Sequence, residues 1–169
     1  MFNRKILVAT TAGLVGLSVM SGSAMASSVS ATANATIIAP ISVSETTQMS
    51  FGDISPDVDN ATTVQLDTAD GVSSPDGAGI AGGTVASGAF SVSGFGTLGF
   101  NITLPGNGVV TLTGPGTAMS VDNFADSLTG SGSLSGGSAT FTVGADLTVG
   151  ANQTAGSYSG SYTVTVNYN

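Results

Sequence analysis

Apolar and polar residues alternate along several stretches of this 169-residue chain. Between Ala139 and Val149 the apolar residues include Phe141, Val143 and Leu147, separated mostly by threonine. A period of two places apolar side chains on one face of a β-strand, and glutamate, a strong helix former, occurs only once. The pattern predicts an all-β protein in which about nine short antiparallel strands form a sandwich.

Turn residues separate the alternating stretches. Residues 98–104 and 109–113 both have strand character, and the Asn107-Gly108 pair between them tolerates the positive φ of a tight turn. This arrangement predicts a hairpin. Residues 68–82 and the glycine- and serine-rich residues 130–137 are predicted to be loops.

The longest alternation covers residues 28–44. Its apolar positions include the candidate assembly residues Val29, Ala31, Ala33, Ala35, Ile37, Ile41 and Val43. This run has two interpretations: a first strand paired within its own domain and broken by Pro40, or a donor strand that completes the sheet of a neighbouring copy. The domain division is then residues 27–44 for this segment and 45–169 for the sandwich. The candidate acceptor edge is the C-terminal alternation, formed by Tyr158, Tyr162, Val164, Val166 and Tyr168.

Residues 1–26 have the pattern of a cleaved secretory signal peptide. Arg4 and Lys5 precede an uncharged apolar run, and Ala24-Met25-Ala26 supplies small residues for cleavage. The apolar run is shorter than the ~20 residues that cross a bilayer. We therefore expect export to the periplasm, cell surface or medium, with no membrane span in the mature chain.

The composition removes most kinds of chemistry. After Lys5 the chain has no basic residue, and it contains no His, Cys or Trp. A serine nucleophile lacks a base, zinc lacks its usual ligands, and nucleic acid phosphates lack positive partners. We expect neither an enzyme nor a nucleic acid-binding protein, and no organic cofactor.

Carboxylates leave calcium as the one cofactor to consider. Asp57, Asp59, Asp67 and Asp70 are hard oxygen ligands in predicted loops, and calcium accepts such ligands with flexible geometry. Their spacing does not match an EF-hand. The alternative interpretation is a solvated acidic loop in which aspartate forms turns.

Two terminal segments carry a resemblance to known families. Ala33-Asn-Ala-Thr-Ile-Ile-Ala-Pro-Ile-Ser-Val-Ser44, followed by Met49-Ser-Phe-Gly-Asp53, resembles the start of the bacterial domain of unknown function 4402, and residues 149–169 resemble its end. The closing Ala-Gly-x-Tyr-x-Gly-x-Tyr-x-Val-x-Val-x-Tyr motif is also similar to pilin subunits of the archaic chaperone–usher type and to spore coat protein U. That second resemblance implies an incomplete immunoglobulin-like sandwich that polymerises by donor-strand exchange. Many of those pilins contain a disulfide, whereas this chain has no cysteine.

These observations lead to two functional hypotheses. The first is a non-catalytic structural subunit of a cell-surface fibre, pilus or coat. Its partners would be copies of itself or related subunits, with a periplasmic chaperone and an outer-membrane assembly protein. The second is a monomeric adhesin or binding module that recognises a glycan or surface protein through residues 68–82 and 126–137. A calcium-dependent surface-layer protein is a third, weaker alternative.

Overall fold

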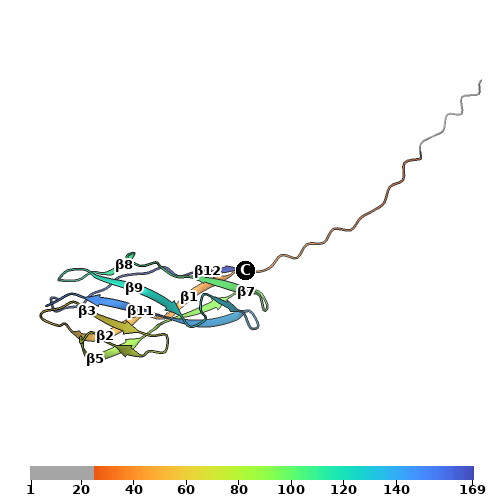
Figure 1. The fold of residues 1–169 in the computed structure, drawn as a ribbon. Coiled ribbons are helices and arrows are strands. Elements are labelled where there is room, and N and C mark those ends of the chain that lie inside the picture. The colour runs from red at the N-terminus through yellow and green to blue at the C-terminus, as the bar shows by residue number, and fades with distance from the viewer. Residues whose placement is uncertain (1–24) are drawn as a thin grey trace, which may run out of the picture. The chain divides into compact units, whose positions relative to one another are not determined.

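A computed structural model of the chain describes residues 25–169, which form β-strands and no helix. The strands are β1 (Ser42–Thr47), β2 (Ser50–Ser55), β3 (Thr62–Leu66), β4 (Val72–Ser73), β5 (Gly79–Ala86), β6 (Gly88–Ser93), β7 (Gly99–Thr103), β8 (Val110–Leu112), β9 (Met119–Asp126), β10 (Ser131–Ser133), β11 (Ser138–Val149) and β12 (Thr165–Tyr168). Every strand pair is antiparallel. The prediction of an antiparallel sandwich is confirmed (Figure 1).

The long strand β11 organises the largest sheet. Its first half pairs with β6 and its second half with β3, while β9 pairs along residues 143–147. The hydrogen-bonded order β1-β6-β11-β3-β4 is extended by β9 and β8. Two smaller sheets, β10-β7-β12 and β2-β5, complete the sandwich.

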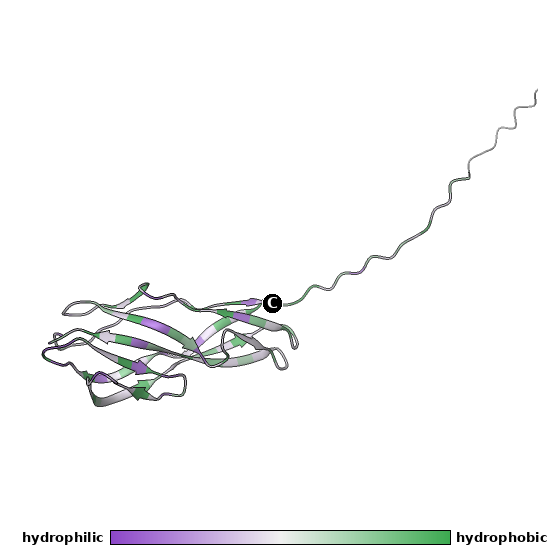
Figure 2. Cartoon of the chain, in the orientation of Figure 1, coloured by the Kyte–Doolittle hydropathy of each residue, from purple (hydrophilic) through white to green (hydrophobic). Residues whose placement is uncertain are grey.

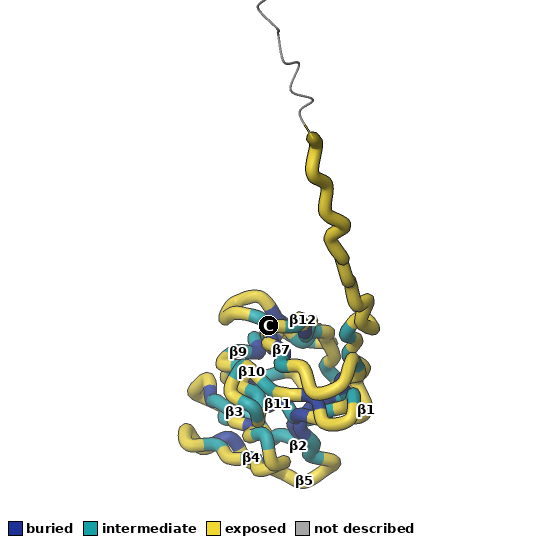
Figure 3. The backbone as a smooth tube through the Cα atoms, turned by 90° about the vertical axis from the view of Figure 1, so that its right-hand side faces the viewer, coloured by how far each residue is buried: buried dark blue, intermediate teal, exposed yellow. Residues whose placement is uncertain are grey.

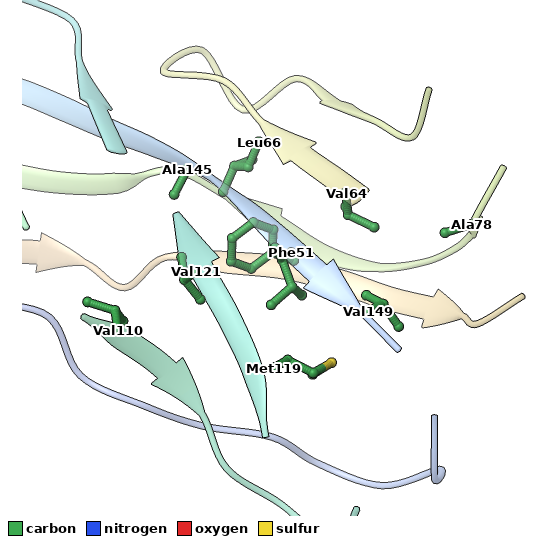
Figure 4. Close-up of a cluster of buried hydrophobic side chains, with 10 residues drawn as sticks. Phe51, Val64, Leu66, Ala78, Val110, Met119, Val121, Ala145 and Val149 are labelled. Atoms are coloured by element: carbon green, nitrogen blue, oxygen red, sulfur yellow. The ribbon is translucent and has the colours of Figure 1, made fainter. Parts of the chain in front are cut away.

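Two clusters of buried side chains form the core between these sheets. The first joins β2, β3, β8, β9 and the second half of β11 around Phe51, Val121 and Val149 (Figure 4). The second joins β6, β7, β12 and the first half of β11 around Phe100 and Val143. Figure 2 shows apolar and polar residues mixed along the strands, in agreement with the alternation in the sequence.

The predicted hairpin of residues 98–113 is wrong. The structure pairs β7 with β10 and β12, and it pairs β8 with β9, so the turn at Gly108 connects different sheets. The reason is visible in the loop, which is tied to β9 rather than folded back on β7. Gly108 N donates to Asp122 Oδ1 at 2.7 Å, and Asn123 N donates to Asn107 Oδ1 at 2.9 Å.

The compact domain comprises residues 37–169, while residues up to 36 belong to a separate unit. The described residues of that unit have no regular secondary structure. The predicted signal peptide, residues 1–26, lies outside the described residues apart from its last two positions. From Met25 onward, the chain has no helix long and apolar enough to cross a membrane.

Candidate functional site: a groove in the sandwich

A groove of about 860 Å³ lies between β2 and residues 153–162, the segment that precedes β12. Seven apolar side chains from three strands line its floor. They come from β8, β9 and β11, and they are Val110, Leu112, Met119, Val121, Phe124, Leu147 and Val149. We call this site the groove, with β2 and residues 153–162 as its two walls.

Each wall has a backbone edge with no β partner in the described part of the chain. Strand β2 pairs only with β5. On the other wall, Ser159 exchanges two hydrogen bonds of 2.9 Å with Thr113, and residues 160–164 belong to no strand. Backbone N–H and C=O groups are obligatory hydrogen-bonding groups. The two walls therefore offer pairing positions to an additional strand.

The floor of the groove is part of the first core cluster. Val121 and Leu147 are almost fully buried there, and Leu112 packs against them from β8. Protein interiors contain few voids larger than a water molecule. The groove is accordingly a surface depression whose walls already cover most of its floor, because Val110, Met119 and Val149 are buried as well.

Tyr162 closes one end of the groove, which we call the tyrosine end. Its ring centre lies 5.2 Å from that of Phe124 and 6.2 Å from that of Phe90. Burial, with a smaller contribution from the Glu45 carboxylate, raises the pKa of Tyr162 to about 12. Its buried hydroxyl has no hydrogen-bond partner among the described residues. Strands β1 and β12 contact each other.

The opposite end, which we call the loop end, lies where both walls finish in loops. One loop follows β2 and the other follows β11. Asn152 N donates to Asp57 O at 2.7 Å and joins them. The groove therefore extends from Tyr162 to Pro56 and Gln153.

The tyrosines of the C-terminal motif owe their positions to glycines. Each one lies against a glycine of a neighbouring segment: Tyr158 against Gly116, Tyr162 against Gly88, and Tyr168 against Gly94. A methyl group at any of these glycines would overlap the tyrosine hydroxyl. Within the motif itself, Gly160 passes so close to the carbonyl of Thr111 that no side chain fits there.

Tyr168 fixes the start of the domain, a role that sequence reasoning missed. Its hydroxyl accepts a hydrogen bond from Phe95 N at 2.7 Å and donates one to Ala39 O at 3.0 Å. Ala39 precedes Pro40, and a residue before proline is biased towards an extended backbone. The N-terminal segment therefore joins the domain at a defined point next to β12.

The candidate assembly residues divide at this point. Val29 is 90 % exposed and Ile37 is 89 % exposed, and residues 25–40 form no strand (Figure 3). Ala31, Ala33 and Ala35 are likewise exposed. Ile41 and Val43 were expected in the same segment, but they pack against the second core cluster of their own domain. The reason is that β1 already pairs with β6, where Val43 lies opposite Val92.

The candidate acceptor residues divide in the same way. Tyr158 and Tyr162 line the groove. Val164, Val166 and Tyr168 do not line it; Val166 and Tyr168 belong to β12, which pairs with β7, and all three pack in or against the second core cluster. The acceptor edge is therefore shorter than the alternation from 158 to 168 indicates.

The four candidate calcium ligands do not gather in one place. Within residues 25–169, no group of three or more acidic side chains could hold a metal ion. Asp57 Oδ1 accepts hydrogen bonds of 2.8 Å from the backbone of Asp59 and Asn60, and Asp67 Oδ1 accepts bonds of 2.7 Å from Ala69 and Gly71. The carboxylates of Asp57 and Asp67 close their own loops. This agrees with the interpretation that these aspartates form turns.

Asp70 has a different structural role. Its Oδ1 atom accepts hydrogen bonds of 2.7 Å from both the backbone N–H and the hydroxyl of Ser87, a buried residue. These bonds, the backbone one first, lower the pKa of Asp70 below its ordinary value of 3.8. Asp70 therefore ties the loop after β3 to the end of β5.

A family model described as Domain of unknown function (DUF4402) matches residues 41–168, which covers nearly the whole compact domain. No curated protein and no solved structure matches the chain.

Proposed function

Because this chain belongs to the DUF4402 family, whose description assigns no activity, we propose its function from its own groove and N-terminal segment. We propose that it is an exported, non-catalytic structural subunit of a cell-surface fibre, pilus or coat. In this assembly, the N-terminal segment of one copy enters the groove of another as an additional strand. The proposed partners are other copies of the chain, assisted during export by a periplasmic chaperone and an outer-membrane assembly protein.

One observation supports this proposal above all others. The same chain has a groove with two unpaired edges and, outside its compact domain, an exposed alternating segment without a strand partner. A strand added to a sheet edge gains main-chain hydrogen bonds, while its alternate side chains fill pockets. The groove has edges without a strand partner, and the N-terminal segment is a potential strand without an edge to pair with.

The dimensions and polarity of the segment agree with the groove. At about 3.3 Å per residue, residues 29–37 extend over about 30 Å. The wall from residue 153 to residue 162 has a similar number of residues. Neither residues 29–37 nor residues 153–162 contain a charged side chain, so the charges that line the groove are the carboxylates of Glu45 and Asp53 on its β2 side.

The N-terminal segment would add a small apolar surface at each odd position. Fully burying a side chain such as Val29 or Ile37 contributes about 1.5–3 kcal/mol. Ala31, Ala33 and Ala35 contribute less, but their size lets the inserted backbone lie close to the floor. Assembly would then come from many moderate contributions spread along the strand.

The decisive experiment compares the mature chain with a variant that lacks residues 27–38. Purified material is run on SDS gels with and without heating, because an inserted strand resists SDS until heated. The mature chain is expected to give a ladder of regular multiples that collapses on heating, and the deletion variant only monomer. A single monomer band for the mature chain in both lanes would overturn the proposal and favour the monomeric binding module.

A synthetic peptide of residues 27–38 provides an independent test on the deletion variant. A ligand that binds only the folded state at 100 times its Kd stabilises it by about 2.7 kcal/mol. The peptide is therefore expected to raise the thermal unfolding temperature. A matched control peptide carries aspartate at positions 31, 33 and 35, and it is expected to leave that temperature unchanged.

A further inference from the structure

The sequence places a glycine directly after aspartate or asparagine at three sites: Asp70-Gly71, Asp76-Gly77 and Asn107-Gly108. At such a pair the glycine nitrogen can attack the side-chain carbonyl carbon, because the glycine has no Cβ atom to hinder the approach. The new N–C bond closes a five-membered succinimide ring, and the side chain releases water from aspartate or ammonia from asparagine. Water then opens the ring on either side, which yields aspartate or isoaspartate.

The Asn107-Gly108 pair is held by three hydrogen bonds, although asparagine is intrinsically more reactive than aspartate in this chemistry. Gly108 N, the attacking atom, donates to Asp122 Oδ1 at 2.7 Å. The Asn107 side chain is held at both of its polar atoms, because Oδ1 accepts from Asn123 N at 2.9 Å and Nδ2 donates to Asn123 Oδ1 at 3.1 Å. Ring closure would have to turn the Asn107 side chain away from Asn123 and release Gly108 N from Asp122.

The Asp70-Gly71 pair is held in the same way. Its attacking atom, Gly71 N, donates to Asp67 Oδ1 at 2.7 Å. The side chain of Asp70 accepts two hydrogen bonds of 2.7 Å from Ser87, one from the backbone and one from the hydroxyl. At both of these pairs, therefore, the fold holds the attacking nitrogen and the side chain that it would attack.

The Asp76-Gly77 pair lacks this arrangement. Both residues are exposed in the turn between β4 and β5. Gly77 N reaches only Ser74 O, at 3.4 Å, which is longer than the roughly 2.7–3.2 Å of ordinary N–H···O hydrogen bonds. Among the residues that the structure describes, the side-chain hydrogen bonds of this turn are made by Ser74 and not by Asp76. A Cβ atom on Gly77 would meet no other atom within 4 Å, so the space around it is open.

We propose that Asp76-Gly77 is the site at which the folded chain forms isoaspartate, whereas the fold keeps Asn107-Gly108 and Asp70-Gly71 intact. Gly77 N forms a bond to Asp76 Cγ, and the nitrogen's proton leaves with the side-chain hydroxyl as water. A second water opens the ring at the backbone carbonyl and produces isoaspartate. Neither Asp76 nor Asn107 lines the groove, so this modification is independent of the proposed function.

Isoaspartate at position 76 changes the main chain between two anchored points. The hydroxyl of Ser74 donates to Thr63 O at 3.0 Å and accepts from Ala78 N at 2.9 Å, and Ala78 is buried in the first core cluster. In isoaspartate the main chain runs through Cβ and is one carbon longer, and the free carboxylate is attached to the α-carbon. Isoaspartyl methyltransferases recognise that carboxylate, so the modified turn is a substrate for this class of enzyme.

Peptide mapping of the full mature chain tests the proposed site. The folded protein and a sample unfolded in guanidinium are incubated at neutral pH and then digested with chymotrypsin, because the chain after Lys5 has no basic residue for trypsin. Mass spectrometry detects the mass increase that accompanies ammonia loss at Asn107. An isoaspartyl methyltransferase with labelled S-adenosylmethionine detects isoaspartate at residue 76, where the mass does not change.

Each site is compared with itself in the two samples. Folding is expected to slow conversion at Asn107 at least tenfold, which corresponds to about 1.4 kcal/mol of activation free energy, and to change isoaspartate formation at Asp76 by less than about threefold. Conversion of Asn107 at the same rate in both samples would overturn the proposal. Protection of Asp76 to the same degree as Asn107 would overturn it as well.

A pair of variants tests the hydrogen bond to Gly108 directly. Asp122→Ala removes the acceptor and is expected to speed conversion of Asn107 about tenfold, whereas Asp122→Asn keeps an acceptor oxygen and is expected to leave Asn107 protected. Asp70 is the internal control for folding, because it stays protected only while Ser87 holds it. Unchanged or slower conversion in Asp122→Ala would overturn the protective role of this bond. If Asp70 also loses protection, the comparison of folded and unfolded natural chain still decides the proposal.

Discussion

The hydroxyl of Tyr168, the penultimate residue of the chain, donates a hydrogen bond of 3.0 Å to the backbone carbonyl of Ala39. The same oxygen accepts a bond of 2.7 Å from Phe95 N. One side chain thus connects the last strand, the loop after β6 and the first residues of the compact domain. The place where the N-terminal segment leaves the domain depends on this contact.

Replacing Tyr168 with phenylalanine is expected to lower the free energy of unfolding by about 1–3 kcal/mol. The estimate rests on a net contribution of about 0.5–1.5 kcal/mol for each of the two hydrogen bonds. Chemical denaturation of the monomeric deletion variant that lacks residues 27–38 measures the effect without interference from polymers. Equal midpoints for the tyrosine and phenylalanine proteins would show that the contact adds nothing.

Gly88 and Tyr162 are expected to be strongly coupled. A methyl group on Gly88 would overlap the Tyr162 hydroxyl, so Gly88→Ala is expected to cost about 1–3 kcal/mol of stability through overpacking. Because that hydroxyl has no hydrogen-bond partner, Tyr162→Phe alone is expected to be nearly neutral.

The double variant Gly88→Ala/Tyr162→Phe completes a double-mutant cycle with the two single variants and the unmodified protein. Removing the hydroxyl makes room for the methyl group, so Tyr162→Phe is expected to recover much of the stability that Gly88→Ala loses. The four free energies of unfolding come from denaturant titrations. Additive effects of the two substitutions would contradict the predicted overlap.

Charge at position 33 is expected to prevent assembly, while the same charge at position 34 is expected to be tolerated. In the proposed complex, Ala33 faces the apolar floor and Asn34 faces away from it. Ala33→Asp would bury a carboxylate without a partner, which is costly. We expect at least a tenfold loss of polymer for Ala33→Asp, measured by light scattering after size-exclusion chromatography.

Asn34→Asp is the matched control, because it adds the same charge one residue away. Its polymer yield is expected to stay within about twofold of the unmodified chain. Similar losses for both variants would show that the added charge acts generally, and that residues 33 and 34 do not face opposite sides.

Acid is expected to weaken the fold partly through Asp70. Hydrogen bonds from Ser87 lower the pKa of this carboxyl in the folded state. Its stabilising contribution is therefore present above the ordinary value of 3.8 and is lost as the pH falls through the lower folded value. Asn at position 70 keeps an acceptor oxygen and tolerates the left-handed backbone, φ 64°, that Asp70 adopts.

The Asp70→Asn variant is accordingly expected to show a shallower loss of stability with acidification. Near neutral pH it should be less stable than the unmodified protein, because a charged acceptor forms the stronger hydrogen bonds. The two curves should converge at strongly acidic pH. Parallel curves of unfolding free energy against pH would rule out this role for Asp70.

The alternation of apolar and polar residues predicted where strands occur better than it predicted which strands pair with each other. The stretch from Ala139 to Val149 is one long strand, because both of its edges find partners. The alternation from Tyr158 to Tyr168 is equally regular, yet only residues 165–168 form a strand. Residues 160–164 lack a strand partner on the groove side, and their own sequence gives no sign that this partner is missing.

The candidate site was predictable in its pieces but not in its geometry. The alternation around Ala33 predicted either a strand of its own domain or a donor strand and did not decide between them. The end of that segment at Ala39 depends on a contact with Tyr168, 129 residues away. Similarly, the groove floor combines Val121 of β9 with Leu147 of β11, whose pairing is a long-range feature. Asp57 and Asp67 were candidate metal ligands because the sequence shows only how the carboxylates are spaced. It does not show that backbone N–H groups of their own loops donate hydrogen bonds to them.

The short connection at Ile38 has a mechanical consequence for a fibre built by strand exchange. A pull on the fibre would act along the inserted strand, because each domain begins almost where that strand leaves its neighbour. The hydrogen bonds on both sides of the strand would then be loaded together in shear, not opened one after another as in unzipping. The tensile strength of each junction would come from simultaneous rupture of many weak bonds, and it would exceed what any single contact in the groove provides.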